Sequence, residues 1–170
     1  MSNQDITIRE LMPDDAETMI AYSKRIGGET DNLTFDFNGF PISVEDEKKF
    51  LASVHDDPKS IMLSAWRGNE LIADASLHSM PRRMSHRAEL GISVVKDEWN
   101  KGIGGMLLEK LIQFAKDADI EIIELSVRSD NNSAIHLYEK YGFKRIGTYP
   151  AFFKIENNYY DFEEMYLDLR

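Results

Sequence analysis

The segment covering residues 86–127 constrains the fold most, because it predicts a strand, a helix and a second strand in direct succession. Apolar residues alternate over 86–95, which indicates the first strand, and one face of it carries Leu90, Ile92 and Val94. A glycine-rich turn then opens a helix over 102–118, and the apolar stretch 120–127 predicts the second strand. Strands joined through a helix lie parallel in one sheet. The chain is therefore expected to contain at least one parallel strand pair.

Hairpins and further helices surround this unit. Strands are predicted over 60–67 and 71–79, joined by the turn Arg67-Gly68-Asn69-Glu70. The other predicted elements are a strand around Ile6 and Ile8, a helix from Pro13 to about Arg25 that Gly27-Gly28 ends, an irregular aromatic loop over 29–42, a helix from Ser43 to about Val54, a short helix from about Ser133 to Tyr141, and strands near 143–149 and 158–168. Because hairpins and a crossover occur together, the predicted fold class is mixed α/β (α+β), with one mixed sheet.

The composition is that of a globular protein. The chain has 170 residues, of which 42% are hydrophobic and 29% charged, so one domain over residues 1–170 is expected. The polar N-terminus and the lack of a long apolar run predict neither a signal peptide nor a membrane span. No cysteine is present, which excludes disulfides and a cysteine nucleophile and favours a cytoplasmic location.

The net charge and the positions of the histidines limit which classes of partner and ligand are expected. A net charge of −10 disfavours nucleic acid and favours cationic partners, although many cytoplasmic proteins are acidic only for solubility. The four histidines are scattered, so no metal site is expected.

The turn that follows the 86–95 strand has the features of a phosphate site. Its glycines, Gly102, Gly104 and Gly105, allow close approach of a ligand to the backbone. The first N–H groups of a helix have no partners within it, so a diphosphate is a natural occupant, and Lys101 can add a positive charge. Neither a Walker A loop nor the fingerprint G-x-G-x-x-G is present. Taken alone, the same glycines are equally compatible with close helix packing.

A second motif follows over residues 131–143. It predicts a short helix with one face made of Ala134, Leu137, Tyr138 and Tyr141. A buried face usually carries aliphatic residues, whereas tyrosine hydroxyls require partners. This face is therefore a candidate for ligand binding as well as for packing.

Together the two motifs resemble the GNAT superfamily of N-acetyltransferases. The acyl-CoA turn of that family, [RQ]-x-x-G-x-[GA], corresponds to Trp99-x-x-Gly102-x-Gly104, with tryptophan in place of arginine or glutamine. The family motif N-x-x-A-[IV]-x-L-Y-x-x-x-G-F is matched from Asn131 to Phe143. Within that superfamily, the chain is similar to the branch that contains ribosomal-protein, spermidine and phosphinothricin acetyltransferases. It implies a mostly antiparallel sheet of about seven strands and about four helices, with a splayed parallel pair at the cofactor cleft.

The resemblance also implies acetyl-CoA as co-substrate. The pantetheine arm would lie beside Val94 and Val95. The diphosphate would lie on the turn formed by Asn100, Lys101, Gly102, Ile103, Gly104 and Gly105. The other side of the arm would be lined by Asn131, Ser133 and Tyr138.

For catalysis, the resemblance places Tyr138 where the family has its general acid. Glu89 is the candidate base, although strand alternation puts it on the face opposite Leu90. The plainer interpretations are a packing role for Tyr138 and a solvated or structural carboxylate for Glu89. Without a cysteine, direct transfer in a ternary complex is favoured over an acyl-enzyme.

The loops 27–42 and 80–86 and the segment 146–158 are expected to form the acceptor pocket. The candidate acceptor-binding residues are Glu29, Asp31, Phe35, His86, Tyr149 and Phe153. The alternative is an ordinary hydrophobic cluster beneath a long loop.

Three functions are compatible with these features. The first is an N-acetyltransferase acting on a primary amine, such as a polyamine, an amino-acid-like compound, an antibiotic or a protein N-terminus. The second is a non-catalytic acyl-CoA sensor, and the third is a nucleotide-binding regulatory domain. No nucleic-acid or membrane partner is expected, and the edge of the last strands would suit a homodimer.

Overall fold

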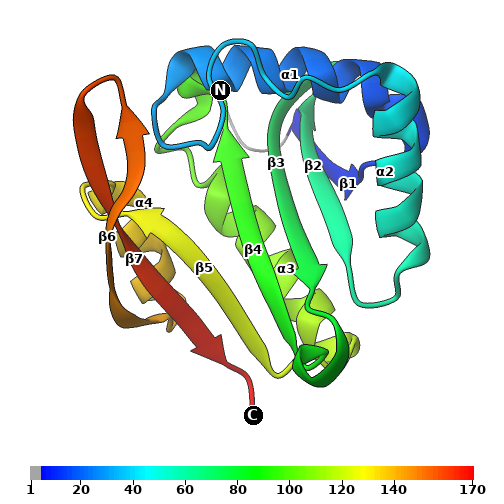
Figure 1. The fold of residues 1–170 in the computed structure, drawn as a ribbon. Helices are drawn as coiled ribbons and strands as arrows, with labels where there is room; N and C mark the ends of the chain where they lie inside the picture. Colours follow the sequence, from blue (N-terminus) through cyan, green and yellow to red (C-terminus); the bar gives the residue numbers. More distant parts are fainter. Residues whose placement is uncertain (1–4) are drawn as a thin grey trace.

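The computed structural model describes residues 5–170, which form one seven-stranded sheet flanked by helices (Figure 1). The strands are β1 (Ile6–Glu10), β2 (Ile61–Arg67), β3 (Glu70–Ser79), β4 (Arg87–Val94), β5 (Ile122–Arg128), β6 (Lys144–Ile155) and β7 (Asn158–Asp168). The α-helices are α1 (Ala16–Glu29), α2 (Val44–Asp56), α3 (Ile103–Asp117) and α4 (Asn132–Lys140). The number of strands and the mixed fold class agree with the prediction.

The strand order across the sheet is β1-β2-β3-β4-β5-β7-β6. All neighbouring strands run antiparallel except β4 and β5, which run parallel. The parallel pair is the one expected from the strand–helix–strand segment, with α3 as its crossover. The sheet is therefore mixed but mostly antiparallel, as predicted.

The β4–β5 pair separates soon after it begins. Pairing covers only three registers, which end at Glu89 opposite Glu124. Among the described residues, the edge of β4 that faces β5 has no strand partner from Leu90 to Val94, while the other edge remains paired with β3. This separation places main-chain groups of β4 at an opening in the sheet.

The helices cover both faces of the sheet. Helix α3 packs on one face against β2, β3 and β4, while α1 and α2 pack on the other against β3 and β2. Figure 1 shows α1 crossing one end of the sheet and α2 lying along the β1–β2 side, with α3 behind. The core between these layers is aliphatic, and its fully buried side chains include Leu77, Leu107, Leu111, Ile123 and Met165. Apolar burial of this kind is the main stabilising contribution.

Helix α1 does not end at Gly27-Gly28 as predicted but continues to Glu29. Gly27 is needed for close contact rather than for termination, because a Cβ there would lie 2.0 Å from the main-chain oxygen of Asp36. The loop after α1 therefore packs directly onto the helix backbone.

Strand β6 is longer than the predicted 143–149 and reaches Ile155. A bulge interrupts its pairing with β7 between Tyr149 and Phe153, and Ala151 has a left-handed φ of 52°. A bulge strongly twists a strand. The β6–β7 hairpin extends past the end of β5, because β7 begins at Asn158 whereas its pairing with β5 begins at Phe162, as seen at the left of Figure 1.

Among residues 5–170, no helix has both the length and the apolarity to cross a membrane.

Candidate functional site

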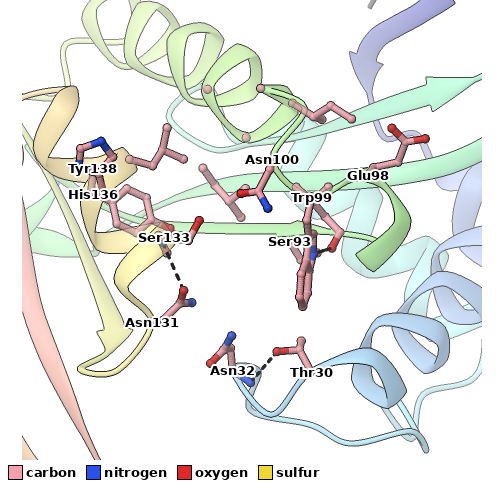
Figure 2. A pocket seen from close by; sticks show the side chains of 18 of the residues that line it. Thr30, Asn32, Ser93, Glu98, Trp99, Asn100, Asn131, Ser133, His136 and Tyr138 are labelled. Atoms are coloured by element: carbon pink, nitrogen blue, oxygen red, sulfur yellow. Dashed lines mark hydrogen bonds between the residues drawn. The ribbon is translucent and has the colours of Figure 1, made fainter. Parts of the chain in front are cut away.

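A cavity of about 550 Å³ lies where β4 and β5 separate. Its walls come from the end of β4, the start of α3, the start of α4, and the end of α1 with the loop after it. Figure 2 shows Trp99 and Asn100 on one side, Thr30 and Asn32 opposite them, and Ser133 and Tyr138 on α4. The predicted cofactor residues that line this cavity are Val94, Asn100, Gly102, Ile103, Gly104, Gly105, Asn131, Ser133 and Tyr138.

The start of α3 presents unpaired backbone donors to the cavity. Gly102 has a φ of +83°, which glycine adopts without strain. Because glycine has no side chain, Gly102 makes no side-chain hydrogen bond to the first N–H groups of α3. The first intrahelical bond runs from the N–H of Met106 to the carbonyl of Gly102, so the N–H groups of residues 103–105 precede the helical ladder. Together with the helix dipole, these donors favour an anion.

Gly104 and Gly105 also allow α4 to pack closely against α3. A Cβ at Gly104 would lie 3.2 Å from a methyl group of Leu137, and one at Gly105 would lie 3.1 Å from the Tyr141 hydroxyl. The Tyr141 hydroxyl in turn donates to Glu109 at 2.6 Å. The packing interpretation and the anion-binding interpretation of these glycines are thus compatible with each other.

Two predicted cofactor residues point elsewhere. Val95 is buried, and its N–H donates to the carbonyl of Ile72 at 2.9 Å. The ammonium group of Lys101 lies 3.3 Å from Glu98, a buried carboxylate that also accepts two hydrogen bonds from Arg67. These ion pairs fix the turn before α3, and Arg67 lowers the pKa of Glu98.

Trp99 lies at the cavity in the position where the family turn has arginine or glutamine. Its indole Nε1 donates to the carbonyl oxygen of Val94 at 2.7 Å, and its side chain is 41% exposed. The indole thus occupies a main-chain acceptor at the unpaired end of β4.

Tyr138 brings a hydroxyl group to the cavity from α4. The residue is buried, its ring packs against Phe143, and no hydrogen bond to its hydroxyl is found within residues 5–170. Burial raises the pKa of Tyr138 to about 12, so the phenol is protonated at neutral pH. Asn131 caps α4 by accepting from the N–H of Ala134, which holds the helix start beside the cavity.

The loop after α1 lines the cavity with Thr30, Asn32 and Leu33 rather than with the predicted Glu29, Asp31 and Phe35. Glu29 accepts from the N–H of Lys96 at 2.6 Å and from Arg25 at 3.0 Å, so both carboxylate oxygens are used in holding the loop. The main-chain oxygen of Asp31 accepts from Arg128. Phe35 packs against Phe40 with the two rings tilted by 47° and their centroids 4.3 Å apart, and it lies against the core beneath the loop.

The remaining predicted acceptor residues are not brought to this cavity. Phe153 packs against Phe162 on the β6–β7 hairpin, and Tyr149 contacts Phe152 while remaining 56% exposed. His86 precedes β4 and lines a separate hollow beside Tyr166. His86 lies eight positions before Val94 along the chain, which corresponds to roughly 26 Å in an extended strand. His86 therefore lies at the opposite end of β4.

Glu89 lies on the face of β4 that is turned toward α1. Ser93, four residues later on the same face, donates to Asp74 of β3 and lies 2.8 Å from the Tyr22 hydroxyl of α1. Ser93 also lines the cavity. Sequence reasoning did not select Ser93, Asp74 or Tyr22, although an aspartate within the apolar stretch 71–77 is the signal that could have found them.

Groups of three or more His, Asp and Glu side chains arranged for a metal ion are not found among residues 5–170. The polar groups that line the cavity are backbone amides, small polar side chains and a phenol.

Known structures with the same fold extend over nearly the whole chain. An acetyltransferase of the GNAT family from Streptococcus pneumoniae superimposes with a TM-score of 0.93 and 29% identity, over 97% of this chain and 99% of that one. A structure of yncA from Salmonella typhimurium with its cofactor acetyl-CoA has a TM-score of 0.85 at 18% identity, over 98% and 95% of the two chains. At that identity the second likeness concerns the fold alone.

The chain is also similar in sequence to acetyltransferases. The N-alpha-acetyltransferase RimI of Mycobacterium tuberculosis is 29% identical over 99 residues, which cover 58% of this chain and 61% of that relative. The alignment thus takes in less than two thirds of the relative. The family described as "Acetyltransferase (GNAT) family" matches residues 29–143, which include the cavity-lining turn, α3 and α4. The resemblance inferred from the two motifs is confirmed, and the chain belongs to the GNAT acetyltransferase family.

Proposed function

We propose that the protein transfers an acetyl group from acetyl-CoA directly to a primary amine. The proposal depends on one observation: the N-terminus of α3 and the hydroxyl of Tyr138 line the same cavity, beside the unpaired edge of β4. Family membership supports it, as does the structural neighbour described with acetyl-CoA.

The residues around the cavity fit acetyl-CoA in charge and in hydrogen bonding. The N–H groups of residues 103–105 would bind the diphosphate, and the main chain of β4 up to Val94 would bind the pantetheine arm. Asn131 and Ser133 would contact the arm from α4. When bound, acetyl-CoA supplies an acyl group that is activated as a thioester.

Tyr138 would stabilise negative charge on the departing sulfur. A thiol has an ordinary pKa of about 8.5, well below the pKa of about 12 that burial gives Tyr138. Complete proton transfer from this phenol to a thiolate is therefore uphill. The hydroxyl acts best as a hydrogen-bond donor that is strongest when the sulfur carries its full charge.

The acceptor amine must lose a proton before it attacks. An alkylamine with a pKa of about 10.4 is less than about 0.1% neutral at pH 7, so a nearby carboxylate has to accept that proton. Glu89 is the first candidate and Asp74, acting through Ser93, is the second. Both are placed on the side of β4 that faces α1. Because the chain has no cysteine, the acetyl group passes to the amine without a thioester to the protein.

Thiol release from acetyl-CoA in the presence of a panel of amines tests this function. Tyr138→Phe keeps the ring that packs against Phe143 but removes the donor. We expect kcat to fall about 100-fold while the Kd for acetyl-CoA changes little. Tyr166→Phe is the matched control, because Tyr166 lies beside His86 at the other end of β4.

Two outcomes would contradict the proposal. If acetyl-CoA binds but no amine releases thiol, the protein is an acyl-CoA-binding sensor. If Tyr138→Phe and Tyr166→Phe reduce kcat equally, the hydroxyl of Tyr138 has no part in the reaction.

A further inference from the structure

The side chain of Trp99 joins the turn before α3 to the end of β4. Its indole Nε1 donates to the main-chain oxygen of Val94 at 2.7 Å, and the ammonium group of Lys96 lies 5.9 Å from the ring centroid, within the range of a cation–π contact. The residue lines the cavity and lies outside the hydrophobic core. Figure 2 shows the indole extending from the turn toward the loop that carries Thr30 and Asn32. The ring is therefore held in place at the cavity without being part of the core.

The carbonyl that Trp99 contacts lies on the edge of β4 that β5 leaves unpaired. The N–H of Val95 donates to Ile72 of β3 at 2.9 Å, and the main-chain groups of successive strand residues point to opposite edges. The main-chain groups of Val94 therefore point away from β3, and those of Ile92 point the same way. Because β5 pairs with β4 only as far as Glu89, these groups face the opening between the two strands.

The indole occupies one main-chain acceptor on this edge and leaves the others to a ligand. The carbonyl of Val94 is the one nearest to α3, because Val94 is the last residue of β4. The N–H of Val94 and both main-chain groups of Ile92 have no strand partner among residues 5–170. The pantetheine arm contains two amide groups, so it can pair with these remaining groups as an added strand would.

The contact between Trp99 and Val94 would limit the arm to one register along β4. Equivalent main-chain groups recur at every second residue of a strand, so an amide that bonded to Val94 instead of Ile92 would move by roughly 7 Å toward α3. Such a shift would draw the thioester away from Tyr138, which is fixed on α4. Displacements much smaller than this can cost about 100-fold in rate.

The residue types found at this position support a role as a donor. The family turn has arginine or glutamine where this chain has Trp99. These three side chains differ in charge, size and shape, but each carries an N–H group. The N–H group is also what Trp99 uses toward Val94. Tryptophan differs from the other two by adding an apolar ring at the cavity.

We propose that Trp99 is a positioning residue for acyl-CoA, whose N–H occupies the Val94 carbonyl so that the arm pairs with β4 in a single register, while its ring contacts the arm beside the diphosphate. That part of the arm carries two methyl groups, and burying them against an indole is favourable. The inference rests on the proposed function, because it adds a residue to the same site.

Two substitutions separate the N–H group from the ring. Trp99→Phe keeps an aromatic ring without the donor, whereas Trp99→Gln keeps a donor without the ring. With the best acceptor of the amine panel, we expect Trp99→Phe to lower kcat about 10-fold while the Kd for acetyl-CoA stays nearly unchanged. We expect Trp99→Gln to raise that Kd about 10-fold while kcat is largely retained. Trp66→Phe is the matched control, because Trp66 is buried in β2, donates to Ser64 and does not line the cavity.

Fluorescence gives a readout that does not depend on turnover. The chain has two tryptophans, so Trp66→Phe leaves Trp99 as the sole emitter and Trp99→Phe leaves Trp66. Titration with CoA should change the emission of Trp99 saturably, with the Kd that calorimetry gives, and should leave the emission of Trp66 unchanged. Adenosine 3′,5′-bisphosphate lacks the arm and should leave the emission of Trp99 unchanged.

The positioning role and acetyl transfer fail in different ways. Equal effects of Trp99→Phe and Trp99→Gln on kcat and Kd, or an emission of Trp99 that bound CoA does not change, would overturn the positioning role but not acetyl transfer. A change caused by adenosine 3′,5′-bisphosphate would place the ring at the nucleotide and overturn the contact with the arm. A change caused by CoA alone, without thiol release for any amine, would support the contact and contradict acetyl transfer.

Discussion

Asp74 has the most unusual environment of the acidic residues near the cavity. It lies in a strand whose neighbours Ala73 and Ala75 are fully buried, and it accepts a hydrogen bond from Ser93. Burial is the main cause that raises its pKa from 3.8 to about 6, with the charge of Glu47 acting in the same direction. An ionised carboxylate kept in such a position costs stability.

The cost at Asp74 predicts a pH-dependent gain for Asp74→Asn. Because the pKa of Asp74 is higher in the folded state, its contribution favours folding fully below about pH 3.8 and is lost as the pH rises through about 6. Asparagine still accepts from Ser93 but cannot ionise. We expect the variant to be more stable than the wild type at pH 8, by up to about 3 kcal/mol, with no advantage near pH 4.

Urea denaturation at pH 4, 6 and 8 measures this difference. A difference in unfolding free energy that is the same at all three values would show that Asp74 does not titrate between them.

At the scale of elements, the glycines at the end of α1 decide where the following loop lies. A Cβ at Gly27 would collide with the main-chain oxygen of Asp36 at 2.0 Å, whereas one at Gly28 would make an ordinary 3.5 Å contact with Phe37. The same loop supplies Thr30, Asn32 and Leu33 to the cavity. The fit of the loop to α1 therefore shapes the cavity wall.

Two neighbouring substitutions separate this contact from helix propensity. Gly27→Ala should lower the unfolding free energy by about 1–3 kcal/mol, because the backbone of the loop must move. Gly28→Ala should be neutral or stabilising, because alanine is the better helix former. Thermal denaturation of both variants checks the prediction, and equal melting temperatures would contradict it.

The elements were largely predictable, because their signals are local. Helix α2 begins where expected, with the Ser43 hydroxyl accepting from the N–H of Asp46, and the glycine turn places α3. The end of α1 was not predictable, because Gly27 is required by its close contact with the backbone of Asp36, and that contact forms only in the folded structure. The surroundings of Glu29 were not predictable for the same reason. Glu29 has the right chemistry for a cation, but Arg25 and the N–H of Lys96 already occupy its two carboxylate oxygens.

At the scale of the whole molecule, the separation of β4 from β5 joins the two sides of the sheet. The N-terminus of α3 and Tyr138 line the cavity, and Ser93, which also lines it, is hydrogen bonded to Tyr22 of α1 on the other side of the sheet. Two substrates could thus meet at β4 without passing each other, which is the arrangement that direct transfer requires. The protein as a whole is acidic, with a net charge of −10, so it attracts a cationic acceptor but repels a polyphosphate. Binding of acetyl-CoA must then depend on the local backbone donors of α3.

Titration calorimetry of the intact protein with acetyl-CoA tests that central claim most directly. The account predicts saturable one-to-one binding with a Kd below about 1 mM at low ionic strength, corresponding to at least about 4 kcal/mol of binding free energy. The absence of saturable heat up to millimolar acetyl-CoA would contradict the assignment of the cavity.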